Sequence, residues 1–437
     1  MRLQHLVTAC RKATVLLASS GTVRRRHVFY VSGFDPNGPS RYHRLYADGA
    51  RQQSEWGPAA IEVGPRKRAP GDPETMTWKV AYHPPPTAVA PTAAATTEAT
   101  EAVETVETDY AFPRWDAIIR AHWWPGHWMQ TKDLLRTSWQ YLVTGAFCRV
   151  RAQGWHQFTT LFNPFLLLVL MLPGAAALLA AGAAVARAWH TGASLAGPLA
   201  AGLVVGAAAL VWAYWARRYW HTQWVLRSYA FVGRMVRQPV PEMEARLDTM
   251  AAALVARVRQ NRDDEVLVVG HSLGSIMAAS VLARALAIDP QLAQRGPALG
   301  LLTLGHCLPL MSNLPAARGF RDELAVLAQC QGLCWVDFSD PLDDYAFPGI
   351  DPFEAAGVDV PRADHPQMRS PGFTAMMAAG PHQLPKMNLH QIHQQYLWAS
   401  PLPQAYDYFA MTAGPLTLAA RFATDRVASR LLADGHG

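Results

Sequence analysis

The stretch EVLVVGHSLG, residues 265–274, decides the fold. Apart from Glu265, its first six residues are an unbroken apolar run, which is typical of a strand covered on both faces in a parallel sheet. Residues 275–287 continue with apolar side chains at helical spacing. We therefore predict a strand, a tight turn and a helix, with Ser272 presented by the turn.

Other segments extend this pattern along the chain. Short apolar and β-branched runs predict strands, and apolar residues spaced three or four apart predict helices. Strands are predicted at 27–32, 61–67, 76–82, 299–305 and 333–339, and helices at 41–53, from 241 to about 258, and at 321–330. Strands that alternate with helices indicate an α/β fold with a mostly parallel sheet flanked by helices.

The composition divides the chain into four regions. Residues 1–82 and 241–437 carry the strand patterns and are predicted to build one domain together. Residues 83–110 consist mainly of Pro, Ala, Thr and Glu, which predicts a low-complexity linker. Residues 111–240 show helical spacing and form the predicted helical insertion.

Two segments of the insertion lack charged residues. Residues 165–186 and 195–215 span 22 and 21 positions, near the roughly 20 that a helix needs to cross a bilayer. A short connector between them predicts a transmembrane hairpin. Arginines flank its outer ends, so the positive-inside rule predicts a multi-pass protein of a bacterial-type inner (plasma) membrane, with the α/β domain in the cytoplasm.

The overall composition excludes several classes of function. The net charge of +6 comes from dispersed arginines, so nucleic acid is not an expected partner and a bilayer surface is. Five cysteines without CxxC spacing predict neither a disulfide framework nor a metal site.

The G-x-S-x-G pattern at residues 270–274, between a strand and a helix, resembles the nucleophile turn of lipases and esterases of the α/β-hydrolase superfamily. The resemblance covers about residues 27–82 and 241–400. It implies that Ser272 is the nucleophile and that the Leu273 N–H faces the developing oxyanion. The Phe34 N–H, in the Gly-rich loop after the strand at 27–32, is the second predicted oxyanion donor.

The superfamily orders its triad as serine, acid and histidine, so the partners of Ser272 are sought downstream. For the acid, Asp343 is the first choice in the turn after the strand at 333–339, and Asp340 and Asp344 are alternatives. For the base, His393 is favoured because His393-x-x-Tyr396 resembles the run that opens the last helix of many such hydrolases. The remaining histidine candidates are His390 and His382.

These features predict a membrane-anchored serine hydrolase that cleaves an acyl ester, lipid-derived esters included, through an acyl-serine intermediate. The mechanism requires no metal ion and no organic cofactor. A different class of function is a catalytically idle hydrolase fold that serves as a membrane-tethered scaffold. Protein partners and the substrate's identity are left open.

Overall fold

The structure is a computed structural model that describes residues 21–85, 104–123, 127–192, 194–220, 222–238, 240–379 and 387–423. The chain divides into two compact units. The first comprises Met1–Arg120, Val240–Ser312 and Ala317–Gly437, and the second comprises Ala121–Pro239 and Asn313–Ala316.

The first unit is built on one mixed sheet. Its strand order is β2-β4-β5-β1-β6-β7-β8-β9, and β3 pairs with β4 outside this path. The strands are β1 (Arg25–Val31), β2 (Ala60–Val63), β3 (Lys67–Ala69), β4 (Asp72–His83), β5 (Val106–Pro113), β6 (Glu265–His271), β7 (Ala298–Leu304), β8 (Leu333–Phe338) and β9 (Gln367–Arg369). From β5 to β9 all neighbours are parallel, whereas β2, β3 and β4 pair antiparallel. The prediction of an α/β fold with a mostly parallel sheet is confirmed.

The first strand in the sequence, β1, lies in the middle of the sheet between β5 and β6. The N-terminal and C-terminal strand regions therefore share one sheet. The register aligns the carboxyl ends of the central strands, because Val31 pairs with Gly270 and His271 pairs with Leu304. Residues that follow β1, β6, β7 and β8 consequently meet at one edge of the sheet.

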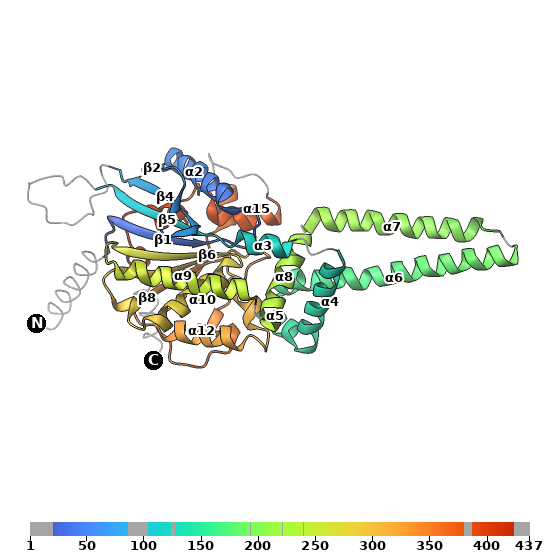
Figure 1. Ribbon diagram of the computed structural model, residues 1–437. Coiled ribbons are helices and arrows are strands. Elements are labelled where there is room, and N and C mark those ends of the chain that lie inside the picture. Colours follow the sequence, from blue (N-terminus) through green and yellow to red (C-terminus); the bar gives the residue numbers. More distant parts are fainter. Residues whose placement is uncertain are drawn as a thin grey trace, which may run out of the picture. The chain divides into compact units, whose positions relative to one another are not determined.

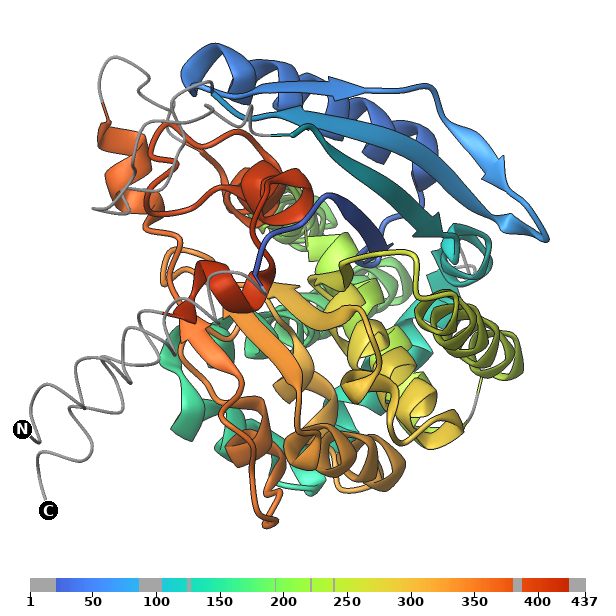
Figure 2. The ribbon, with the colours of Figure 1, turned by 90° about the vertical axis from the view of Figure 1, so that its left-hand side faces the viewer.

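Helices cover both faces of this sheet (Figures 1 and 2). One face carries α9 (Pro241–Arg259), α10 (Gly274–Ile288) and α12 (Arg318–Gln329), and the other carries α2 (Gly38–Trp56) and α16 (Tyr408–Ala413). Shorter elements complete the unit: η1 (Leu292–Gln294), α11 (Leu308–Ser312), α13 (Pro352–Ala356), α14 (Phe373–Ala378), α15 (Leu389–Gln394), η2 (Gln395–Leu397) and α17 (Leu418–Arg421).

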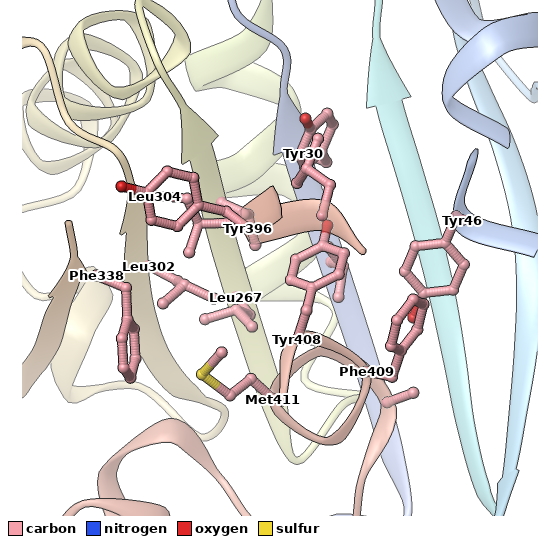
Figure 3. Packing of buried hydrophobic residues seen from close by; sticks show 14 of the residues in the cluster. Tyr30, Tyr46, Leu267, Leu302, Leu304, Phe338, Tyr396, Tyr408, Phe409 and Met411 are labelled. Atoms are coloured by element: carbon pink, nitrogen blue, oxygen red, sulfur yellow. The ribbon is translucent and has the colours of Figure 1, made fainter. Parts of the chain in front are cut away.

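An aromatic cluster fills the space between the sheet and the helices α2 and α16 (Figure 3). Tyr46 of α2 packs edge-on against Phe409 of α16, with ring centroids 5.1 Å apart. On the sheet, Trp78 stacks on Tyr110 at 4.5 Å. Each large aromatic side chain buried in this way contributes about 1.5–3 kcal/mol through the apolar area that it removes from water.

The strand β5 lies in a segment that the sequence predicts as linker. Residues 86–103 of that segment lie outside the described part of the chain, but β5 begins at Val106 and occupies a position inside the sheet. Val106, Thr108 and Tyr110 are buried while Glu107 is exposed, which is the alternation of a strand. The adjoining Pro-, Ala- and Thr-rich composition hides this pattern in the sequence, so the predicted linker boundary at 110 is wrong.

The second unit is helical. Its elements are α4 (His127–Val143), α5 (Ala146–Gln153), α6 (Trp155–Thr191), α7 (Ala196–Trp220) and α8 (Thr222–Arg237), and α3 (Asp116–Trp123) spans the boundary between the units. The long helices α6 and α7 run side by side (Figure 1). At the close approach of α4 and α8, a Cβ at Gly233 would lie 2.7 Å from Oγ1 of Thr137, so only glycine fits there.

The predicted membrane spans at 165–186 and 195–215 lie within α6 and α7. Nevertheless, no helix in the described residues combines the length and the apolarity needed to cross a bilayer. The predicted transmembrane hairpin, and with it the predicted inner-membrane localisation, is wrong. The prediction depends on the length of the two segments and on their lack of charge, which do not by themselves establish a membrane span.

Candidate active site

Ser272 lies in a strained turn between β6 and α10. Its φ of 58° falls in the left-handed region, which costs a non-glycine residue about 1–3 kcal/mol. The flanking glycines permit the turn: a Cβ at Gly270 would lie 2.7 Å from the Gly274 oxygen, and one at Gly274 would lie 2.6 Å from the Ser32 oxygen. The G-x-S-x-G spacing therefore follows from close backbone contacts on both sides of the serine.

The two segments that carry the predicted oxyanion donors lie beside Ser272. Leu273 is the N-cap residue of α10, and the first N–H groups of a helix have no acceptor within it. Across the turn, a Cβ at Gly33 would lie 2.9 Å from Cβ of Ser272, so the Gly33–Phe34 peptide is packed directly against the serine. The buried Phe34 ring is anchored by Trp115, with centroids 6.1 Å apart. Two backbone segments thus converge on one side chain.

His393 and Asp343 form a buried pair. Nδ1 of His393 lies 2.7 Å from Oδ2 of Asp343, and their side chains are 1% and 0% exposed. Because a carboxylate only accepts, Nδ1 carries the proton and Nε2 carries the lone pair that a base needs. The Tyr396 hydroxyl donates to Oδ2 at 3.0 Å and the Tyr345 N–H donates to Oδ1 at 3.1 Å, which fixes the carboxylate from three directions.

A short chain of contacts links this pair to Ser272. The Ser272 N–H donates to the Leu304 oxygen at 2.9 Å, and Gly305 follows at a φ of 55°. A Cβ at Gly305 would lie 3.1 Å from Oδ2 of Asp343, so the acid approaches the backbone next to the serine. On the other side, Nε2 of His271 lies 2.8 Å from the His393 oxygen. The turn of Ser272 and the Asp343–His393 pair therefore lie close together at the carboxyl edge of the sheet.

Cys307 lies in the same place, although its sequence context gives no sign of a role beside Ser272. Burial, followed by the charge of Asp343, raises the pKa of its thiol, and a hydrogen bond with the Ser272 side chain opposes that rise. The Cys307 N–H donates to Oγ of Ser275 at 3.0 Å, and Ser275 in turn donates to the Ser272 oxygen at 2.6 Å. A neutral thiol beside Ser272 helps to fix the turn without competing as a nucleophile.

The alternative residues occupy other positions. Asp340 accepts the Phe373 N–H at 2.8 Å and the Leu342 N–H at 3.0 Å, so its carboxylate holds loops together and makes no hydrogen bond with His393. Asp344 follows Asp343 in the same turn, but Asp343 is the residue that bonds to His393. His390 is half-buried in α15, almost one helical turn before His393. His382 lies outside the described residues.

The carboxylate Asp337, within β8, belongs to a separate buried network. Thr303 and Ser339 donate hydroxyls to it at 2.7 and 2.8 Å, and Nε2 of His306 lies 3.9 Å away. Burial raises the pKa of Asp337, and His306 is the largest influence opposing that rise. The order serine, acid, histidine separates this combination from Asp343–His393, because His306 precedes Asp337 in the chain.

Comparison of the chain with family models, curated proteins and solved structures gives no match. The chemistry open to the site is therefore set by its own groups. These are a serine hydroxyl on a strained turn, an imidazole with one defined tautomer, a fixed carboxylate and two backbone segments beside the hydroxyl. Within the described residues, no group of three His, Cys, Asp or Glu side chains is arranged to hold a metal ion.

Proposed function

We propose that the protein is a serine hydrolase that cleaves an acyl ester through an acyl enzyme on Ser272. The observation that carries this proposal is the 2.7 Å pair between Nδ1 of His393 and Oδ2 of Asp343, buried next to a serine with a positive φ. This pair supports the base and the orienting acid of a proposed catalytic triad, and the turn that carries Ser272 lies beside it. It also supports the resemblance of residues 270–274 to the nucleophile turn of the α/β-hydrolases.

The proposed reaction uses the groups of the site in turn. Nε2 of His393 takes the proton of Ser272 as Oγ attacks the acyl carbon, and the N–H groups of Leu273 and Phe34 stabilise the negative charge on the carbonyl oxygen. The ester bond then breaks, and the imidazolium donates its proton to the departing alkoxide. His393 next takes a proton from water, whose oxygen attacks the acyl-serine. Release of the carboxylic acid restores Ser272, while Asp343 holds the imidazole throughout.

A fluorophosphonate probe tests this proposal directly. The probe forms a bond between phosphorus and the serine oxygen and expels fluoride, so it reports an activated serine without knowledge of the substrate. Purified wild-type protein should be labelled, and Ser272→Ala should not. The matched control is Ser280→Ala. Ser280 lies in α10 and is as buried as Ser272, but its hydroxyl donates a hydrogen bond to Glu323.

Equal labelling of wild type and Ser272→Ala would exclude Ser272 as the nucleophile. A wild-type protein that is folded but not labelled would instead favour the idle hydrolase-fold scaffold. Turnover of p-nitrophenyl esters of increasing chain length, measured with the same variants, then defines the acyl group that the site accepts. The absence of turnover by every labelled form would contradict the acyl-ester part of the proposal.

A further inference from the structure

The residue before the nucleophile makes a contact that the triad mechanism does not use. His271 is the last residue of β6 and is 4% exposed. Its ring lies against that of His393, with centroids 5.0 Å apart, and Tyr396 lies beyond at 6.1 Å. Its Nε2 lies 2.8 Å from the main-chain oxygen of His393. The nucleophile's own turn is therefore bonded to the backbone of the base.

The partner atom determines the protonation of His271. A carbonyl oxygen only accepts, so Nε2 must carry the proton. Burial, followed by the positive charge that His393 can carry, lowers the pKa of His271 to about 3, and the nearby His390 acts in the same direction. Nδ1 of His271 makes no hydrogen bond within the described residues. The ring is thus a neutral donor with one defined tautomer near pH 7 and has no proton-transfer role.

This contact complements the one made by Asp343. Asp343 fixes the His393 ring through Nδ1 but does not fix the backbone from which the ring extends. His271 bonds to that backbone, and Ser272 is the residue that directly follows His271. With both contacts in place, the position of Nε2 of His393 relative to Oγ of Ser272 is set by the nucleophile turn itself. A displacement of about 1 Å at such a site lowers the rate of the chemical step by about a hundredfold.

We propose that His271 is a positioning residue that aligns His393 with Ser272 by donating a hydrogen bond from Nε2 to the His393 main-chain oxygen. This inference rests on the proposed hydrolase function. It predicts an effect on kcat with little effect on KM, because the contact orients the base and does not touch the ester. It also predicts that a replacement works only if it delivers an N–H at the position of the imidazole Nε2.

Two substitutions of His271 that introduce side-chain amides of different length test this requirement. The side-chain nitrogen of glutamine in His271→Gln reaches the position of Nε2, whereas that of asparagine in His271→Asn reaches only the position of Nδ1. Hydrolysis of p-nitrophenyl butyrate by His271→Gln should retain a kcat within about threefold of wild type. His271→Asn should lower kcat by about 10–100-fold with KM changed less than threefold. Both variants replace the ring with an amide and so share the packing defect.

His27→Gln is a matched control for the loss of a buried imidazole. His27 also lies in the sheet and burial lowers its pKa to about 3, but it pairs with Val266 near the amino end of β6, five residues before His271. This variant should lose stability and keep its kcat per folded molecule. Folded fractions measured by circular dichroism normalise every rate.

The outcomes separate this inference from the proposed function. If wild type is labelled at Ser272 and His271→Asn matches His271→Gln in kcat, the positioning role is wrong and the hydrolase proposal stands. If wild type shows no Ser272-dependent labelling, both are wrong. Nitrogen-15 NMR of the histidine rings gives a second readout: a proton on Nδ1 of His271 between pH 5 and 8 would overturn the proposed hydrogen bond even in an active enzyme.

Discussion

Two buried Asp–His combinations lie at the carboxyl edge of the sheet, and they are arranged in opposite ways. In the first, Nδ1 of His393 lies 2.7 Å from Asp343. In the second, Nε2 of His306 lies 3.9 Å from Asp337, and neither ring nitrogen of His306 makes a hydrogen bond within the described residues. The same two residue types therefore form a bonded pair in one place and only an electrostatic contact in the other.

The number of other donors does not distinguish the two carboxylates. Asp337 accepts hydroxyls from Thr303 and Ser339, one on each oxygen. Asp343 likewise accepts the Tyr396 hydroxyl at Oδ2 and the Tyr345 N–H at Oδ1. At Asp343, however, Oδ2 also accepts from Nδ1 of His393, whereas Nε2 of His306 lies 3.9 Å from Asp337. An acid orients a histidine when the other donors hold the carboxylate without occupying the direction of the ring. Burial and proximity alone do not produce that arrangement.

The largest expected difference between the two combinations is in the histidines. His393→Gln should lower kcat by about 10⁵–10⁶-fold, because it removes the proposed general base. His306→Gln should change kcat less than about threefold per folded molecule. Ester hydrolysis measured on both proteins, with folded fractions from circular dichroism, tests this. A loss above a hundredfold in His306→Gln would mean that the second combination takes part in the chemistry.

Substitution of the two acids should give a smaller difference in kcat, again with the larger loss in the Asp343–His393 pair. Asp343→Asn keeps the shape of the side chain but favours the wrong tautomer of His393, and kcat should fall by about 10⁴-fold. Asp337→Asn should leave kcat within about threefold of wild type. Comparison of kcat for the two variants measures the contrast. Equal losses would contradict the assignment of Asp343 as the orienting acid.

Much of this contrast cannot be predicted from the sequence. The apolar run at 265–270 and the glycines around Ser272 predict the turn, because strand burial and close backbone contacts are local requirements. The choice among Asp340, Asp343 and Asp344 depends instead on how the turn after β8 folds against Tyr396 and α15. That packing joins residues more than fifty positions apart.

Two other features escaped sequence analysis for similar reasons. His271 stands in the motif itself, but its partner atom belongs to the backbone of His393 and leaves no trace in residue types. The strand β5 follows a Pro-, Ala- and Thr-rich stretch, and its half-buried pattern becomes clear only beside β1 and β4. Local patterns predicted the elements, whereas contacts between distant segments determine the site.

A third expected effect concerns the Tyr396 hydroxyl, which donates a hydrogen bond to Asp343. Tyr396→Phe removes the donor to Oδ2 and leaves the Asp340 N–H without its acceptor, since that N–H donates to the tyrosine oxygen at 2.9 Å. The free energy of unfolding should fall by about 1–3 kcal/mol and kcat by about tenfold. Urea denaturation and ester hydrolysis measure the two effects.

Tyr30→Phe is the matched control for that variant. Tyr30 is buried in the same unit, but its hydroxyl makes no hydrogen bond within the described residues. Removal of this hydroxyl should leave kcat unchanged and should not lower stability, because no partner loses its bond. If Tyr396→Phe behaves like Tyr30→Phe, the steadying role of the Tyr396 hydroxyl is contradicted.

The smallest expected effect is the pH dependence of stability at Asp337. Burial raises the pKa of this carboxyl, so the folded state binds its proton more tightly than the unfolded state. The contribution of Asp337 to stability is therefore full at a pH below the unfolded value near 3.9 and is lost as the pH rises through the folded value. Asp337→Asn removes this dependence, and the variant should gain stability relative to wild type as the pH increases from 4 to 7. Urea denaturation of both proteins across that range measures the difference. If the variant instead loses stability relative to wild type as the pH rises, the prediction is contradicted. Thr303 and Ser339 would then stabilise the charged carboxylate more than burial penalises it.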